Sequence, residues 1–409
     1  MEHATETQGA AMAIPRRRSL AAWCEAGLQV VALILPPLLA LASRGVAVLA
    51  IVAGLCAAGL VVATRKPSLG ALRRPALPLL ALAAWGALSA LWSIDPERSL
   101  MLAARLAALF AAALALAAAA GLVAAPRRLA WCLAAGMALG LVIAGVDYST
   151  GGGVLRHFYT RPYRPTQLNQ FVVMLTILAL PLGAMLVCRG RVLLGIVGTA
   201  AMLVAVAWLV DTGAKLALVA AVPVGILLYW GGSKWARAGA VLSLAAIAVA
   251  PLALPRLAQV PALMAAADSV KNSGGHRLLI WRFAGDRIAE HPLIGWGLDS
   301  SRMVPGGKEQ ARQWQDLMPL HPHNAALQLW LELGLPGAAL FALLVSLLWW
   351  RLADAAWPPL YTAAAGGGLT AALVILFEAY GVWQEWWLGA LALMLFLVLV
   401  MGRAAKPER

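Results

Sequence analysis

The chain has 409 residues, of which 62% are hydrophobic and 12% are charged, and its mean hydropathy is +0.81. These values exclude a soluble globular protein, and apolar runs of about 17–25 residues are typical of membrane helices rather than of the short strands of a β-barrel. The formal net charge of +14 would indicate a nucleic-acid partner in a soluble protein. Here Lys and Arg gather between the apolar runs, where they set topology or meet anionic lipids and substrates, so we expect an all-α integral membrane protein with no nucleic-acid partner.

The polar leader, residues 1–22, precedes an apolar run without a small-residue cleavage signal, and we expect it to remain as a cytoplasmic tail. The cysteines fall in or beside apolar runs without close spacing, so neither a disulfide framework nor a zinc site is indicated. They are Cys24, Cys56, Cys132 and Cys188.

About twelve apolar segments are predicted to be membrane helices. In chain order they cover residues 23–43, 45–64, 75–93, 99–124, 129–147, 168–188, 192–210, 214–230, 236–254, 324–350, 360–380 and 386–402. Helices 1–9 then occupy residues 23–254, and helices 10–12 occupy residues 324–402. A large loop at 255–323 separates the two groups, and a second cytoplasmic tail follows at 403–409.

Short basic loops alternate with loops that are poor in positive charge, which predicts that both tails are cytoplasmic. Two loops predicted to face outward, 148–167 and 255–323, are themselves basic, but long loops translocate largely regardless of charge. We therefore expect a cationic outer face. The sequence contains no internal repeat with paired broken helices, the pattern typical of inverted-repeat transporters.

The large loop is predicted to be partly helical. In NSGGHRLLIWRFAGDRIAE the apolar spacing predicts a helix, with Ser273 as its cap and Arg277 in its first turn. A cation in a first turn opposes the helix dipole and favours an anionic partner. That partner is a ligand or, in the alternative, a local acid such as Asp268 or Asp299. The glycines of the following segment, 295–297, predict a tight turn.

A polar segment runs directly into an apolar helix in HPHNAALQLWLELGLPG, residues 321–337. His323 and Asn324 stand at the start of that helix, where they either cap its first backbone N–H groups or contribute to a site. Glu332 is an acid inside an apolar span and requires a partner. A hydrogen bond to Gln328, one turn earlier, is favoured over a catalytic role.

Aromatic and polar residues gather before the last apolar segment. An aromatic belt at the membrane interface is favoured over a sugar-stacking site for this cluster. Its members are Tyr380, Trp383, Gln384, Glu385, Trp386 and Trp387.

HRLLIWRFAGDRIAEHPLIGWG followed by HPHNAALQLWLELGLPG resembles the paired signature of the O-antigen ligase and polymerase superfamily. Its members have an Arg and a Trp ahead of an HPLxGxG turn, and an HN pair that opens the next membrane helix. O-antigen ligases share a narrower pattern: His, then Asn, Ser or Gln, nine residues, Gly, two residues, and Gly, Thr or Tyr. His323, Asn324, Gly334 and Gly337 fit that spacing. The resemblance implies a GT-C-like glycosyltransferase architecture.

The resemblance also implies a reaction. Superfamily members move a glycan from undecaprenyl diphosphate to an acceptor at the periplasmic face of the inner membrane. For a ligase, the donor is undecaprenyl-diphosphate-linked O-antigen, and the acceptor is the lipid A-core oligosaccharide of lipopolysaccharide. An O-antigen polymerase is the alternative within the superfamily.

The resemblance implies that His323 is the catalytic base, because an imidazole with a pKa near 6.5 suits removal of a proton from an acceptor hydroxyl. His321 and His276 are equally suited on chemistry alone, and the motif position favours His323. Arg161, which precedes the helix of Asn169, and Arg277 are expected to stabilise the departing diphosphate.

Lys215 lies at a position where the family often has Arg, so we expect a point-charge contact with phosphate there rather than a bidentate one. Further residues are expected to bind the diphosphate or the sugar. They are Arg164, Arg282, Asn324 and His321.

We expect no metal and no cofactor, because the outward loops lack an acidic cluster for a divalent ion. The same loops lack a carboxylate pair for double displacement, which favours a single inverting step. Two other classes of function are weighed against this one. A small-anion transporter should carry polar residues near the midplane of several helices, whereas these spans are mostly Ala, Leu and Val. A structural envelope protein would not need a His and several arginines on one face.

Overall fold

The computed structural model describes residues 2–64, 69–158, 164–209, 211–270 and 272–407. Within them the chain forms fourteen α-helices, five short 3-10 helices and one antiparallel two-stranded hairpin. The α-helices are α1 Glu2–Leu41, α2 Val46–Thr64, α3 Leu69–Leu88, α4 Pro96–Ala119, α5 Pro126–Ser149, α6 Asn169–Cys188, α7 Val192–Trp208, α8 Thr212–Gly231, α9 Ser233–Leu257, α10 Pro261–Val270, α11 Asn272–Glu290, α12 Ala325–Ala353, α13 Pro359–Glu378 and α14 Glu385–Ala404. The short elements are η1 Ser43–Gly45, η2 Ser89–Leu91, η3 Leu155–His157, η4 Pro165–Leu168, η5 Ser300–Arg302, β1 Gln310–Arg312 and β2 Gln315–Asp316.

Among the described residues, ten helices are long and apolar enough to cross a membrane, and two shorter apolar stretches, Ala76–Leu91 and Val192–Trp208, join them. Each segment predicted from hydropathy overlaps one of these helices. The chain is therefore an all-α, multi-pass integral membrane protein, and the predicted fold class is confirmed. The first span is Leu20–Leu41, the later part of the long helix α1.

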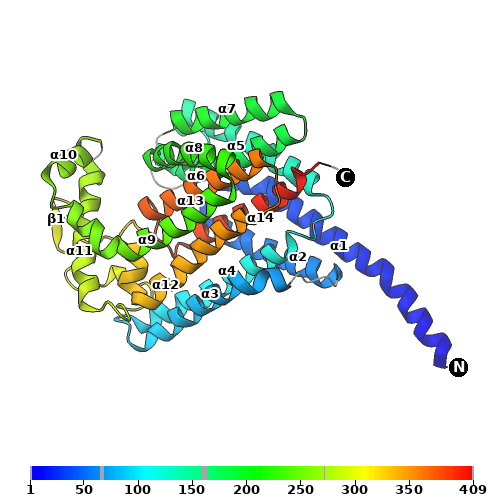
Figure 1. Ribbon diagram of the computed structural model, residues 1–409, viewed down its shortest axis with the longest axis horizontal. Coiled ribbons are helices and arrows are strands. Elements are labelled where there is room, and N and C mark those ends of the chain that lie inside the picture. Colours follow the sequence, from blue (N-terminus) through cyan, green and yellow to red (C-terminus); the bar gives the residue numbers. More distant parts are fainter. Residues whose placement is uncertain (1, 65–68, 159–163, 210, 271, 408–409) are drawn as a thin grey trace.

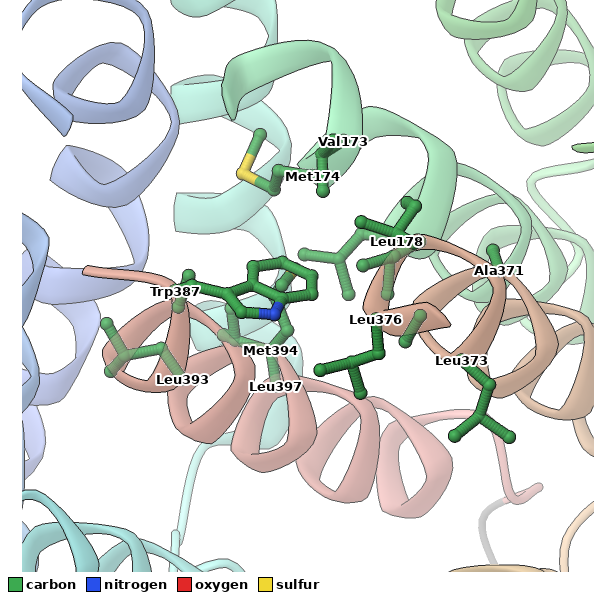
Figure 2. Close-up of a cluster of buried hydrophobic side chains, with 14 of the residues drawn as sticks. Val173, Met174, Leu178, Ala371, Leu373, Leu376, Trp387, Leu393, Met394 and Leu397 are labelled. Carbon is green, nitrogen blue, oxygen red and sulfur yellow. The ribbon is translucent and has the colours of Figure 1, made fainter. Parts of the chain in front are cut away.

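The centre of the bundle is formed by α6, most of whose residues are buried. It packs against α7, α13 and α14. Figure 2 shows the Trp387 indole of α14 lying between Met174 of α6 and Leu376 of α13, close to Leu397 on its own helix. This apolar packing holds the start of α14 and the end of α13 in a defined position relative to each other.

At one end of the molecule lie α10, α11 and β1, while both chain termini lie toward the other end (Figure 1). The predicted helix of the large loop is present as α11, which packs on α9, α10 and α12. It begins at Asn272, one residue before Ser273, so the prediction that Ser273 caps it is wrong. Arg277 consequently lies in the second turn, and the predicted first-turn position is also wrong. The hairpin β1–β2 in the same loop was not predicted.

Helix α12 is broken in its middle, because Gly334 has a φ of 62° and Pro336 follows two residues later. Proline has no N–H and leaves the carbonyl four residues earlier, on Glu332, without a helical partner. The turn at 295–297 supplies partners: Trp296 N donates to the Leu331 carbonyl at 2.9 Å, and Gly297 N donates to the Glu332 carbonyl at 2.8 Å. The two parts of the sequence signature therefore meet backbone to backbone.

The glycines of that turn are required by its conformation and by the close approach. Gly295 and Gly297 have φ values of 69° and 99°, which L side chains rarely adopt. A Cβ on Gly295 would overlap the Glu332 carbonyl, and one on Gly334 would overlap the Leu293 carbonyl. The predicted tight turn is confirmed, and it fixes the segment that leads into the candidate site.

Candidate active site

The histidine pair that precedes α12 packs on the segment that joins α13 to α14. The rings of His321 and His323 lie 4.3 Å apart between centroids. His323 has a φ of 54°, an unusual conformation for a residue with a side chain, and its ring nitrogen Nδ1 lies 2.6 Å from the Ala379 carbonyl oxygen. Gly381 lies against the His321 ring, where an added Cβ would be 2.8 Å from Cδ2. The fold thus holds both rings firmly.

These contacts set the proton positions on both rings. A carbonyl oxygen can only accept, so His323 Nδ1 carries the proton and donates it to Ala379, which leaves Nε2 with a free lone pair. His321 Nδ1 accepts a hydrogen bond from the His323 backbone N–H at 3.1 Å, so its proton resides on Nε2. Of the two imidazoles, His323 therefore presents Nε2 as a proton acceptor.

Burial lowers the pKa of both histidines. The pKa of His321 falls from 6.5 to about 3, chiefly because the ring is buried and also because His323, Arg302 and Arg277 disfavour a positive charge. The pKa of His323 is lowered by burial and by the charges of Arg277 and His276, against the opposing effect of the Ala379 carbonyl. Both rings are accordingly neutral at pH 7, the state in which a histidine can accept a proton.

Asn324 is held at both ends of its amide. Its Oδ1 accepts from Leu327 N at 3.0 Å and caps α12, and its Nδ2 donates to the Phe377 carbonyl at 2.9 Å. Asn324 therefore caps the helix, one of the two alternatives predicted from the sequence, and it also ties α12 to the end of α13. Its predicted contact with substrate stays a prediction.

Arg277 of α11 forms an ion pair with Glu378, the residue between the two carbonyls that hold Asn324 and His323. One turn further along α11, Trp281 Nε1 donates to the Pro322 carbonyl at 3.0 Å, which docks the helix on the histidine segment. Burial lowers the pKa of Arg277, while Asp211 acts in the opposite direction. The structure thus brings Arg277 and His323 together around one short backbone segment.

The acids considered as local partners of Arg277 are engaged elsewhere. Asp268 pairs with Arg312 at 2.7 Å, and Asp299 pairs with Arg98 at 2.5 Å. Asp299 also lies 3.3 Å from Arg302. The alternative that one of these two acids neutralises Arg277 is therefore wrong, because the partner is Glu378, far along the chain.

The start of α8 borders the same group. Asp211 caps this helix by accepting from Ala214 N at 3.0 Å, and a Cβ on Gly213 would overlap the Glu378 carboxylate. Lys215 follows on the first turn of α8 and is exposed. Tyr380 is partly buried nearby, and desolvation together with Asp211 raises its pKa.

The other predicted site residues are less clearly connected to the histidine pair. Arg282 is exposed and, five residues beyond Arg277, points about 140° around α11 from it. Arg164 is exposed at the start of η4, an element that contacts α1 and α6. His276 Nε2 lies 2.8 Å from the Asp316 carbonyl oxygen. Arg161 lies outside the residues that the structure describes.

Glu332 is fully buried and accepts four hydrogen bonds, from Asp299 N at 2.7 Å, Gln328 Nε2 at 3.0 Å, Trp383 Nε1 at 2.6 Å and the hydroxyl of Ser301. The predicted contact with Gln328 is confirmed. The predicted aromatic belt is wrong for Trp383 and Trp387, whose exposed fractions are 5% and 0%. They are core residues because the link between α13 and α14 folds into the bundle instead of lying at its lipid-facing surface.

The sequence analysis considered the later part of segment 377–384 only as an aromatic belt or a sugar-stacking site, and it missed the contact of this segment with the histidine motif. Besides the contacts above, Val382 N donates to Gln328 Oε1 at 2.9 Å. The available signal was the polar interruption FEAYGVWQE between two apolar spans. It marks a segment with more polar groups than a simple connection needs.

Within the described ranges, no group of three or more His, Cys, Asp or Glu side chains could hold a metal ion. The positive groups around the histidine pair are guanidinium and ammonium groups. Such groups can stabilise a developing phosphate charge by charge-assisted hydrogen bonds.

The comparisons with known proteins concern the part of the chain that carries Lys215, Arg277 and the histidine motif, but not segment 377–384. Residues 197–342 match the family model described as O-antigen ligase. Three curated relatives, each named "Putative polysaccharide ligase", come from Rickettsia species.

The protein of Rickettsia conorii is 32% identical over 141 residues, which are 33% of this chain and 33% of that protein. The protein of Rickettsia bellii is 33% identical over 141 residues, again 33% of each chain. The protein of Rickettsia prowazekii is 31% identical over 140 residues, 33% of this chain and 34% of that protein.

The chain thus matches about a third of the length of these relatives. The family match includes Lys215, Arg277 and the whole histidine motif, so the predicted resemblance to the superfamily is confirmed. It supports a ligase-type function. Over residues 197–342, this membrane protein is similar to the O-antigen ligase family.

Proposed function

We propose that this protein is an O-antigen ligase, which transfers O-antigen polysaccharide from undecaprenyl diphosphate to the lipid A-core oligosaccharide. The observation that carries the proposal is the state of His323. Its Nδ1 proton is committed to the Ala379 carbonyl, its Nε2 is free to accept a proton, and Arg277 is anchored on the adjacent Glu378. A neutral base beside a cationic clamp is what the departure of a diphosphate and the attack of a hydroxyl require.

In this mechanism the acceptor hydroxyl gives its proton to His323 Nε2 while its oxygen attacks the anomeric carbon of the donor sugar. The bond from that carbon to the diphosphate oxygen breaks, and the electron pair leaves with the diphosphate. One displacement on the opposite face inverts the anomeric centre and needs no enzyme nucleophile. Cationic side chains, not a metal, stabilise the charge on the departing diphosphate.

Arg277 is the first candidate to bind the donor diphosphate, because it is half-buried and lies next to the base. Its ion pair with Glu378 orients the guanidinium and leaves other N–H groups of its five donors for phosphate oxygens. Lys215, on the first turn of α8, adds a point charge. Arg161, Arg164 and Arg282 belong to the same proposal as further contacts at this face, with Asn324 and His321 at the sugar.

The site faces the periplasm in this proposal, and the protein resides in the inner membrane. Support comes from the positive-inside rule, under which Arg127 and Lys234 face the cytoplasm and Arg282 faces outward. Because Arg282 is exposed, a cysteine in its place should react with a membrane-impermeant thiol reagent in cells with a permeabilised outer membrane. Protection of that cysteine from the reagent would contradict the orientation.

The test of the proposed function is deletion of the gene in its host, followed by gel analysis of lipopolysaccharide. A ligase predicts loss of the whole O-chain ladder with accumulation of undecaprenyl-linked polymer, restored by the intact gene. A core that carries a single O-unit would identify a polymerase instead, and unchanged lipopolysaccharide would refute both activities.

A further inference from the structure

A cavity of about 480 Å³ lies next to the histidine pair and is not used by the mechanism above. It is bordered by η1, by the first turns of α4, by η5 and by the start of α14. None of its lining residues lies on α8 or α11, the helices that carry Lys215 and Arg277. His321 is the member of the histidine pair that lines it.

The lining of the cavity carries an excess of positive charge. Four arginines, Arg44, Arg98, Arg105 and Arg302, line it together with two carboxylates, those of Asp299 and Glu385. Arg98 and Arg302 share Asp299, and Arg105 pairs with Glu385 at 2.9 Å. Arg44 forms no ion pair with any residue that the structure describes. The excess charge suits an anion that carries more than one negative charge, such as a phosphate group.

The remaining lining is suited to a sugar joined to a lipid. Trp386 presents an indole at the wall, and its Nε1 donates to Gln384 Oε1 at 3.1 Å, which fixes the ring. A fixed aromatic face can cover the apolar face of a sugar ring, while Gln384 and His321 offer polar groups. The cavity is also bordered by Met101, which is 49% exposed on the α4 surface. Hydrocarbon at the mouth of the cavity suits the chain of a membrane-anchored ligand.

We propose that this cavity binds the phosphorylated sugar headgroup of a membrane glycolipid, which is the acceptor substrate. The proposal rests on the function proposed above. It gives the two substrates separate binding sites near the histidine pair, with the donor diphosphate at Arg277 and the acceptor between α4 and α14. Separate sites are compatible with an inverting displacement, in which the attacking hydroxyl and the departing diphosphate lie on opposite faces of the sugar.

The experiment measures binding to the full-length protein in nanodiscs, without any turnover. The first probe is a synthetic acylated disaccharide with a phosphate on each sugar. The comparison probes are the same lipid without phosphates, the phosphorylated disaccharide without acyl chains, and inorganic phosphate. The variants are Arg44→Gln, Arg105→Gln and their double variant. The matched control is Arg256→Gln, which removes the charge of an exposed arginine on α9 that does not line the cavity.

Each single substitution should weaken binding of the phosphorylated glycolipid by about 3- to 10-fold and the double substitution by roughly 10- to 100-fold, because these arginines are partly exposed and distinct. Arg256→Gln and Arg277→Ala should leave this binding unchanged. The dephosphorylated lipid and the probe without acyl chains should bind more weakly. In transfer assays the acceptor KM should rise in the cavity variants, with donor KM and kcat unchanged.

Three outcomes would overturn the inference. One is equal binding of the glycolipid by the wild type and the double variant. Another is binding of inorganic phosphate as tight as that of the glycolipid, which would make the cavity a simple anion site. The third is a rise in donor KM instead of acceptor KM. Arginine-dependent glycolipid binding by a protein that transfers no glycan would support the site and refute only the proposed function.

Discussion

The two sides of the histidine pair are built differently. On the His323 side, the ring nitrogen, the Asn324 amide and Arg277 are each held by the consecutive residues 377–379. On the His321 side, four arginines face two carboxylates around an open cavity. The first side is fixed in geometry and nearly balanced in charge, and the second is open and positively charged. Under the proposed function, the preorganised side would carry out proton transfer and the open side would bind the charged acceptor.

The largest effect is expected from a change that disturbs both sides at once. Gly295→Ala would place a Cβ on the Glu332 carbonyl at a φ of 69°. Glu332 in turn holds Asp299 of the cavity and Trp383, so we expect a loss of stability of more than about 3 kcal/mol and little folded protein. Size-exclusion chromatography and thermal unfolding in detergent measure it.

The matched control for this substitution is Gly145→Ala on α5, where an added Cβ meets nothing within 4 Å. This control should leave the protein folded, because alanine is favoured over glycine in a helix. A Gly295→Ala protein with the wild-type unfolding temperature would show that the backbone contact between the turn and α12 does not hold the site.

A smaller effect is expected from Arg277→Lys, which acts only on the fixed side. Lysine keeps the charge but loses the planar fork that can serve Glu378 and a phosphate together, so donor affinity should fall by about tenfold. Binding of the acceptor-like glycolipid should not change. Titration of each substrate in separate binding experiments measures both values, and a loss confined to the glycolipid would reverse the assignment of the two sides.

The pH dependence of transfer should also report the protonation of His323 on the fixed side. Because burial lowers the pKa of His323, the base stays neutral at pH 6.5 and activity should be lost only as the pH falls further, through the lowered pKa. The acid limb of the kcat/KM profile measures this. A limb centred above pH 6.5 would contradict it.

The free energy of unfolding should depend on pH in the same direction as the activity. Both histidines remain neutral in the fold while the unfolded chain binds protons below pH 6.5, so the free energy of unfolding should decrease as the pH falls. For His321 this decrease extends toward a pH of about 3. A His321→Gln variant should lose part of that dependence.

The smallest effect is expected from metal removal. Cationic side chains supply the positive charge on both sides, so transfer should persist in excess EDTA. Rates measured with chelator and after addition of Mg²⁺ or Mn²⁺ test this. Activity abolished by EDTA and restored by either ion would redirect attention to Asp299 and Asp316.

Much of the fold and part of the site could be predicted because the signals are local. Hydropathy over about 20 residues predicts a membrane helix, the Asn of an HN pair predicts a cap, and a GWG segment predicts a turn. The start of α11 was mispredicted because serine is a favoured N-cap, whereas Ser273 lies inside the helix. Gly275 also lies inside α11, where it packs against Asp268 of α10, so close tertiary packing overrides its low helix preference.

The rest of the site depends on contacts that no local pattern encodes. Ala379 lies 56 residues from its partner His323 in the chain, and Trp383 lies 51 residues from Glu332. The cavity joins Arg44 from η1 to Arg98 and Arg105 on α4 and to residues at the start of α14. Each of these arginines by itself looks like an ordinary charge at a helix end, and only the packing of three distant segments brings them together.

The central claim, that His323 is the base on the fixed side, is tested most directly by measuring donor binding and transfer in parallel for His323→Ala. Because the diphosphate contacts lie on Arg277, donor affinity should be nearly unchanged, while kcat falls by roughly 10²–10⁴-fold. A thermal-unfolding measurement first confirms that the variant is folded. Loss of donor binding, with an undiminished rate from the donor that is still bound, would make His323 a ligand for the carrier and would contradict the account.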